Sequence, residues 1–121
     1  MALKINLKEL AENYKQKRRI DKKTLSEITT SISTGLEIKP GDCILDIGCG
    51  SGRILLPLAA KNPKSKFIGV DISKEMLDSL NKDISKGQVD NVTALEHDAN
   101  YKLPFVDKQW DIQKLTYEVG L

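Results

Sequence analysis

The sequence predicts a single α/β domain in which helices cover both faces of a parallel β-sheet. Its 121 residues are enough for one compact core. Short apolar runs at residues 43–47, 66–70 and 92–96 end at glycine or a polar residue, as buried parallel strands do. Helical patterns separate these runs, and each unit takes about twenty to thirty residues, which is typical of βαβ units.

The first part of the chain is predicted to be helical. Apolar residues recur at helical spacing over residues 6–17. A second helix is expected to begin after Asp21, whose side chain can cap it, and to end at Gly35. We therefore expect an N-terminal helical segment at residues 1–35 and a sheet-containing domain at residues 36–121.

Turn and helix signals fall between the predicted strands. Residues 39–42 (KPGD) form a turn. The helix expected over residues 53–61 contains Pro57, which should bend it at a cost of about 3 kcal/mol if nothing compensates. Ser73 is expected to cap the next helix, and Gly87 to end it.

The last part of the chain carries weaker signals. Residues 103–107 are interpreted as a loop, and residues 110–115 as a fourth, weaker strand. Gln113 and Lys114 interrupt the apolar run of this strand, which speaks against full burial.

Composition excludes several classes of function. The formal charge of +2 is too small to indicate a nucleic acid or an anionic membrane as partner. The sequence shows no membrane span and no signal peptide. Cys43 and Cys49 lack a CxxC spacing, which favours neither zinc nor a disulfide, so a reducing cytoplasm is expected. His97 is the only histidine, which leaves little material for a metal site or a Ser-His-Asp triad.

A glycine-rich turn, GCGSG at residues 48–52, follows the first strand. The dinucleotide fingerprint is GxGxxG, but here Gly52 arrives one residue early. Asp46 lies two positions before Gly48, inside the strand. A carboxylate there repels phosphate and suits an ammonium group. The turn therefore favours a phosphate-free, ammonium-bearing ligand over a nicotinamide dinucleotide.

Residues 44–52 (ILDIGCGSG) resemble the first motif of class I S-adenosylmethionine-dependent methyltransferases. The resemblance implies a Rossmann-like sheet and S-adenosyl-L-methionine as the cofactor, with the amino group of its methionine portion beside Asp46. It also implies that Asp71 accepts hydrogen bonds from the ribose hydroxyls and that Asp98 faces adenine. The cofactor-binding residues predicted in this way are Asp46, Gly48, Cys49, Gly50, Gly52, Asp71, Ile72, Asp98, Ala99 and Leu115.

The resemblance extends from about residue 36 through DANYKLPFVDKQWD at residues 98–111 and stops after the fourth strand. Because the family's domain continues with three more strands, the fold is expected to be partial, with strand order 3-2-1-4 and an exposed fourth strand. Such an edge predicts a fragment, completion by a partner chain, or self-association through residues 111–117.

The function implied by the resemblance is methyl transfer from the cofactor. A small-molecule acceptor is expected, partly because the chain lacks a basic face, with no nucleic acid and no membrane as partner. The cofactor supplies the reactivity in such a reaction, so we assign no catalytic base and no metal. Two alternatives stay open. One is a truncated module that binds the cofactor without activity, and the other is a nicotinamide dinucleotide-binding domain.

Overall fold

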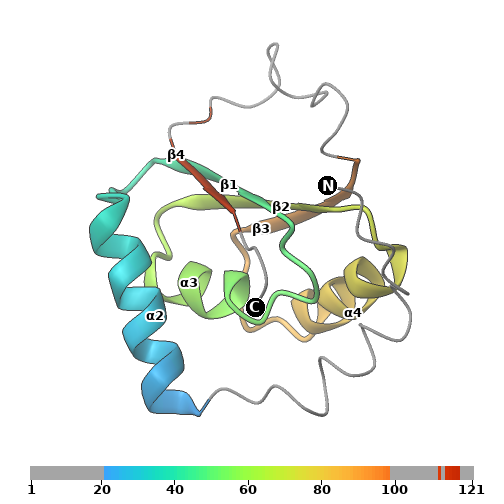
Figure 1. Cartoon of the computed structure of the whole chain (residues 1–121), viewed down its shortest axis with the longest axis horizontal. Helices are drawn as coiled ribbons and strands as arrows, with labels where there is room; N and C mark the ends of the chain where they lie inside the picture. Colours follow the sequence, from blue (N-terminus) through green and yellow to red (C-terminus); the bar gives the residue numbers. More distant parts are fainter. Residues whose placement is uncertain (1–20, 99–111, 113, 118–121) are drawn as a thin grey trace, which may run out of the picture.

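A computed structural model of the chain describes residues 21–98, 112 and 114–117. The alternation of helices and strands up to β3 confirms the predicted α/β class. The helix predicted over residues 6–17 and the loop at residues 103–107 lie outside the described residues. None of the described helices is long and apolar enough to cross a membrane. The elements, shown in Figure 1, are α2 (Lys22–Gly35), β1 (Cys43–Ile47), α3 (Leu55–Lys61), β2 (Lys66–Asp71), α4 (Lys74–Ser85), β3 (Val92–Glu96) and β4 (Lys114–Tyr117).

The four strands form one parallel sheet in the order β3-β2-β1-β4, which confirms the predicted order. β1 is central because it pairs with β2 on one side and with β4 on the other. Ile47 near the end of β1 lies opposite Val70 of β2, and Asp71 of β2 lies opposite Glu96 of β3. The carboxyl ends of the strands therefore meet at one edge of the sheet.

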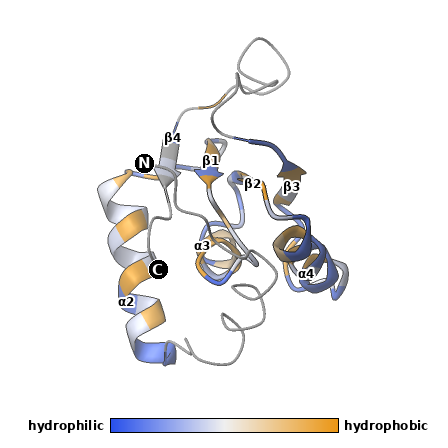
Figure 2. Ribbon diagram, turned by 45° about the vertical axis from the view of Figure 1, so that its right-hand side comes forward, coloured by the Kyte–Doolittle hydropathy of each residue, from blue (hydrophilic) through white to orange (hydrophobic). Residues whose placement is uncertain are grey.

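Residues of the sheet alternate between two apolar clusters, one on each face. Ile44 and Phe67 belong to the cluster under α2, α3 and α4, which lie together on one side of the sheet in Figure 2. Among the described residues, helices thus pack on one of the two faces that the sequence predicted to be covered. The cluster on the opposite face consists of Cys43, Leu45, Ile47, Ile68 and Val70, with Leu95 and Ile112 packed against it.

The predicted helix caps are largely confirmed. Asp21 Oδ1 accepts a hydrogen bond from the Thr24 N–H (2.8 Å) at the start of α2. Ser73 Oγ accepts one from the Met76 N–H (3.2 Å) at the start of α4. Gly87, with φ of +78°, follows the last turn of α4 as expected.

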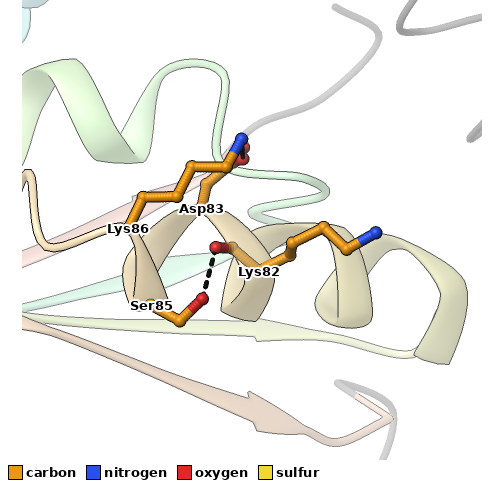
Figure 3. Close-up of polar contacts among 4 residues, drawn as sticks. All are labelled: Lys82, Asp83, Ser85 and Lys86. Atoms are coloured by element: carbon orange, nitrogen blue, oxygen red, sulfur yellow. Dashed lines mark hydrogen bonds and ion pairs between the residues drawn. The ribbon is translucent and has the colours of Figure 1, made fainter.

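The last turn of α4 is also held by side chains at its surface. In Figure 3, the Ser85 hydroxyl donates to the Lys82 carbonyl (2.6 Å), and Lys86 Nζ lies 3.4 Å from Asp83 Oδ1. Both partners of this ion pair are well exposed, so it adds little to stability. The end of α4 is therefore determined mainly by its backbone and by Gly87.

α2 ends at Gly35, as predicted, but this glycine does not supply the left-handed residue after the helix. Gly35 is the last helical residue, but the residue with left-handed backbone is Glu37, with φ of +52°. The N–H groups of Glu37 and Ile38 donate to carbonyls of the last helical turn (both 3.1 Å), as in a Schellman motif. Leu36 and Ile38 pack against the cluster under the helices, and this packing places the left-handed position at Glu37 rather than at glycine.

Pro57 lies nearer the start of its helix than the sequence predicted. The helix was expected from Arg53, but α3 begins at Leu55, so Pro57 is its third residue. N–H groups in the first turn of a helix have no partner within that helix. The Leu56 N–H donates to the Gly52 carbonyl (2.9 Å) and the Leu58 N–H to the Ile54 carbonyl (3.0 Å), so proline leaves out only the bond between these two. A helix tolerates proline in its first turn, so the cost is smaller than for a proline in the helix interior.

The fourth strand is shifted from its predicted position. It was expected over residues 110–115, but β4 spans Lys114–Tyr117 and pairs with Ile44–Ile47 of β1. Ile112, which lies before the strand, packs against the second cluster. Pairing with β1 therefore selects this strand more strongly than the hydrophobicity of its own residues does.

Candidate functional site

The turn between β1 and α3 bends back onto the end of β2. The N–H groups of Gly48 and Cys49 both donate to the Val70 carbonyl (2.8 and 3.1 Å). Gly48, Gly50 and Gly52 have φ of +77°, +58° and +86°, a region that residues with a Cβ rarely adopt. The backbone conformation of the turn therefore favours glycine at each of these three positions.

The side of this turn that faces the helices is tightly packed. A Cβ on Gly52 would lie 2.5 Å from Leu80 Cδ1 and 3.1 Å from Leu56 Cγ. Cys49 is 2% exposed, and its Sγ would lie 2.7 Å from a Cβ on Gly69. Both Cys49 and Gly52 were predicted to bind the cofactor. The Cys49 side chain lies in the protein interior, and a Cβ on Gly52 would also point there.

Asp71 ends β2, and its half-buried side chain joins two loops. Its Oδ2 accepts a hydrogen bond from the Gly50 N–H (2.8 Å), and its Oδ1 accepts one from the Ser73 N–H (2.8 Å). The Asp71 backbone carbonyl accepts a third bond from the His97 N–H (3.0 Å). Through these bonds Asp71 connects the glycine turn, the start of α4 and the end of β3.

A cavity of about 260 Å³ opens where the carboxyl ends of β1, β2 and β3 meet. Four of the predicted residues line it: Gly48, Asp71, Ile72 and Asp98. Ile72 is 53% exposed, which is unusual for a large apolar side chain. An exposed apolar side chain beside two carboxylates suits a ligand with a flat apolar face and polar donors. The full lining is Ile47, Gly48, Val70, Asp71, Ile72, His97 and Asp98.

Asp46 does not line this cavity. It is 1% exposed and lies opposite Gly69 of β2 and Thr116 of β4. It alternates with residues of the second cluster, so it lies on the helix-covered face of the sheet. The sequence predicted that Asp46, Asp71 and Asp98 share one cleft, and the structure places two of the three there.

The remaining predicted residues are less informative. Ala99 lies outside the described residues, and Leu115 pairs with Leu45 in the register of β4 against β1. His97, by contrast, lines the cavity although the sequence analysis gave it no role. Its place directly after the third strand could have identified it, because ligands of parallel α/β sheets bind at the carboxyl ends of the strands.

Comparisons with known proteins agree with this architecture. Residues 41–117 match the family model described as "Putative methyltransferase". The chain is 33% identical over 78 residues to demethylmenaquinone methyltransferase of Lactobacillus johnsonii, covering 64% of this chain and 32% of the relative. The YcgJ protein of Bacillus subtilis superposes with a TM-score of 0.62 at 29% identity, covering 76% and 37% of the two chains. PKMT2 of Rickettsia typhi, solved in complex with AdoHcy, gives 0.55 at 29% identity, covering 64% and 15%.

The relatives correct one prediction. The chain is 32% identical over 83 residues to the 23S rRNA (uracil(1939)-C(5))-methyltransferase of Aliivibrio salmonicida, covering 69% of this chain and 18% of the relative. The inference that the small net charge excludes a nucleic acid partner was therefore wrong. The chain spans about a third or less of the length of the curated relatives it matches. The net charge of a chain that matches so small a share of its relatives does not report on the acceptors that those relatives use.

The family match covers more than half of the chain and includes every described strand. The parallel sheet and its strand order agree with that match. The chain belongs to the class I S-adenosylmethionine-dependent methyltransferases.

Proposed function

We propose that this chain binds S-adenosyl-L-methionine at the carboxyl edge of its sheet and serves in methyl transfer. The observation that carries this proposal is the cavity in which Asp71 and Asp98 lie together beside the glycine turn. Two carboxylates offer acceptors to hydroxyl and amino donors, as an adenosyl group requires.

The cavity residues fit the adenosyl part of this cofactor. Each Asp71 oxygen accepts one N–H and keeps a further acceptor position, so the carboxylate can also receive the two ribose hydroxyls. Asp98 would accept from the exocyclic amino group of adenine, and the exposed Ile72 would cover a face of the base. Gly48 adds no side chain to the wall, so a ligand can approach the backbone closely.

The family resemblance assigns the amino group of the cofactor to Asp46, which lies in β1 two residues before the turn. Cys49, Gly50 and Gly52 would support the methionine portion through their backbone. Ala99 and Leu115 remain predictions of the family resemblance.

A nicotinamide dinucleotide fits this cavity less well. Asp71 does not discriminate by itself, because an acid at this distance from the turn also binds the ribose of NAD. The early Gly52 and the carboxylate of Asp46, which would repel a pyrophosphate at the turn, argue against this ligand. The Gly50 N–H also already bonds a carboxylate, which occupies one donor of the turn.

The chemistry of methyl transfer divides between cofactor and chain. When bound, the cofactor supplies a sulfonium methyl group to a nucleophilic acceptor. The described residues hold the adenosyl group in one orientation and exclude water from part of it. We assign no proton transfer to His97.

Calorimetry tests the binding proposal. We expect S-adenosyl-L-methionine and S-adenosyl-L-homocysteine to bind and NAD to bind far more weakly. Asp71→Asn and Asp98→Asn should each lower the affinity roughly tenfold through a lost charged acceptor. Asp78→Asn is the matched control, because Asp78 is exposed on α4 and does not line the cavity. Tighter binding of NAD, or equal affinity in all three variants, would overturn the proposal.

A second candidate function is cofactor binding without transfer. The observation in its favour is that the relatives extend well beyond the part matched here. Transfer of a labelled methyl group to demethylmenaquinone and, separately, to 23S rRNA decides between the two candidates. Both acceptors occur in the names of relatives, so the assay also tests the prediction of a small-molecule acceptor. Binding without label transfer to either acceptor would support the second candidate.

A further inference from the structure

Three successive N–H groups of the glycine turn point at the end of β2. Those of Gly48 and Cys49 donate to the Val70 carbonyl, and that of Gly50 donates to the Asp71 carboxylate. The first two bonds join backbone to backbone, so no side-chain atom takes part in them. The third depends on a single side chain, 21 residues away in sequence.

The third bond holds the residue of the turn that has the least other support. Gly50 belongs to no helix or strand, so no regular backbone ladder holds it. A Cβ placed on it would meet only Met76 Sδ, at 3.8 Å, so packing holds it weakly as well. A bond from an N–H to an ionised carboxylate is about twice as strong as a neutral one. The Asp71 carboxylate is therefore the strongest described restraint on Gly50.

We propose that Asp71 is a positioning residue that holds the glycine turn in its ligand-ready shape before the ligand arrives. This role is separate from the ribose contact proposed above. The restraint on the free chain does not depend on the proposed function, whereas its consequence for affinity rests on it.

The two carboxylate oxygens of Asp71 restrain two different segments of the chain. Oδ2 holds Gly50, and Oδ1 holds the N–H of Ser73, whose own hydroxyl caps α4. Loss of the carboxylate would release the turn and loosen the start of α4 together. A turn that is held in advance loses less conformational freedom on binding, so the ligand keeps more of its interaction energy.

Hydrogen exchange in the ligand-free protein tests the restraint directly. We expect the Gly50 amide to be protected in the wild type and to exchange roughly tenfold faster or more in Asp71→Ala. Asp71→Asn, which keeps one acceptor, should free only one of the Gly50 and Ser73 amides. The Phe67 amide, which bonds the Asn91 carbonyl, should not change and so reports any global loss of stability.

Glu96→Gln is the matched control for this experiment. Glu96 is exposed and lies opposite Asp71 in the register of the sheet. The substitution therefore removes one charge at the same sheet edge and leaves the Asp71 carboxylate in place. It should leave the Gly50 amide protected. An unprotected Gly50 amide in the wild type would overturn the proposal without any variant, and so would equal protection in Asp71→Ala.

A second experiment separates the restraint from the ribose contact. S-adenosyl-L-homocysteine and its 2′,3′-dideoxy analogue are titrated into wild type and Asp71→Asn. If Asp71 acts only on the ribose, both proteins bind the dideoxy analogue equally well, and the positioning role in binding is rejected. We expect instead a further loss of about threefold to tenfold for the analogue in the variant. If the wild type binds neither ligand, the proposed function fails, and the exchange data alone decide on the restraint.

Discussion

The two sides of the glycine turn obey different constraints. On the side that faces the helices, Gly52 and Cys49 meet neighbouring atoms that leave no space for a larger group. On the side that faces the cavity, Gly48 lines open space. Gly50 does not line the cavity, but a Cβ on it would have one neighbour, at 3.8 Å. One short turn thus serves packing on one side and ligand access on the other. Glycines that look equivalent in the motif therefore meet different requirements: close packing at Gly52 and ligand access at Gly48.

The largest expected effect comes from Gly52→Ala on the packed side. The new methyl group would clash with Leu80 and Leu56, and φ of +86° is unfavourable for alanine. We expect a loss of about 2–4 kcal/mol in the free energy of unfolding, from overpacking and backbone strain together. Urea denaturation measures this loss. Gly50→Ala is the matched control with strain alone and should cost about 1 kcal/mol. Equal costs for the two variants would contradict the comparison.

Gly69→Ala tests the packed side without backbone strain. Its Cβ would lie 2.6 Å from Leu55 Cδ2 and 2.7 Å from Cys49 Sγ. We expect a loss of about 1–3 kcal/mol in unfolding free energy. The loss should be smaller in a Cys49→Ala background, because removing the thiol relieves one of the two contacts. Strict additivity in this double-mutant cycle would show that Cys49 and Gly69 do not compete for the same space.

Ile72→Ala tests the open side. Because Ile72 is 53% exposed, its truncation should change the free energy of unfolding by less than about 0.5 kcal/mol. The affinity for S-adenosyl-L-homocysteine should fall roughly fivefold to thirtyfold through lost apolar contact with the base. Calorimetry and urea denaturation on the same preparation measure both quantities. A large loss of stability with unchanged affinity would reverse our assignment of this residue.

Glu37→Gly tests the energetic cost of left-handed backbone by itself, without a change in packing or ligand contact. Glu37 has left-handed backbone like Gly50, but it is exposed and lies far from the turn in sequence. Relief of its strain should stabilise the protein by about 0.5–1 kcal/mol, after the larger chain entropy of unfolded glycine is counted. Thermal and urea unfolding measure the gain. Glu37→Ala, which keeps the strain, should show none of it.

The smallest expected effect is on the pH dependence of stability, and it comes from Asp21, which caps α2. The Thr24 N–H holds the pKa of the Asp21 carboxyl below its ordinary value of 3.8. A carboxyl whose pKa is lowered by folding stabilises the folded state above the unfolded pKa. This contribution is lost as the pH falls below 3.8 through the folded pKa. Urea midpoints of the wild type should therefore fall more steeply over that interval than those of Asp21→Asn, and parallel curves would rule out the capping contribution.

Local sequence signals predicted most of the regular structure. The strands at residues 43–47 and 92–96 have the predicted bounds, and Asp21 and Ser73 cap their helices as expected. These features depend on residues within a few positions of one another, which is why a pattern can reveal them. The division into residues 1–35 and 36–121 stays a prediction.

The candidate site was predictable only in part. The motif resemblance identified Gly48, Asp71, Ile72 and Asp98, all of which line one cavity. It could not place Asp46 in the interior, because the burial of a strand residue depends on which helices cover that face. It also missed His97, since a histidine at a strand end has meaning only once the neighbouring strands are in place.

The sequence by itself therefore determined the α/β class, because periodicity and caps are local properties of the chain. The strand order and the family came from the resemblance of residues 44–52 to a known motif. Only the tertiary structure decided which side of the glycine turn is packed, that Glu37 takes the left-handed position, and that β4 begins at Lys114. Each of these depends on contacts between segments far apart in the chain, and such contacts form only when the elements have come together.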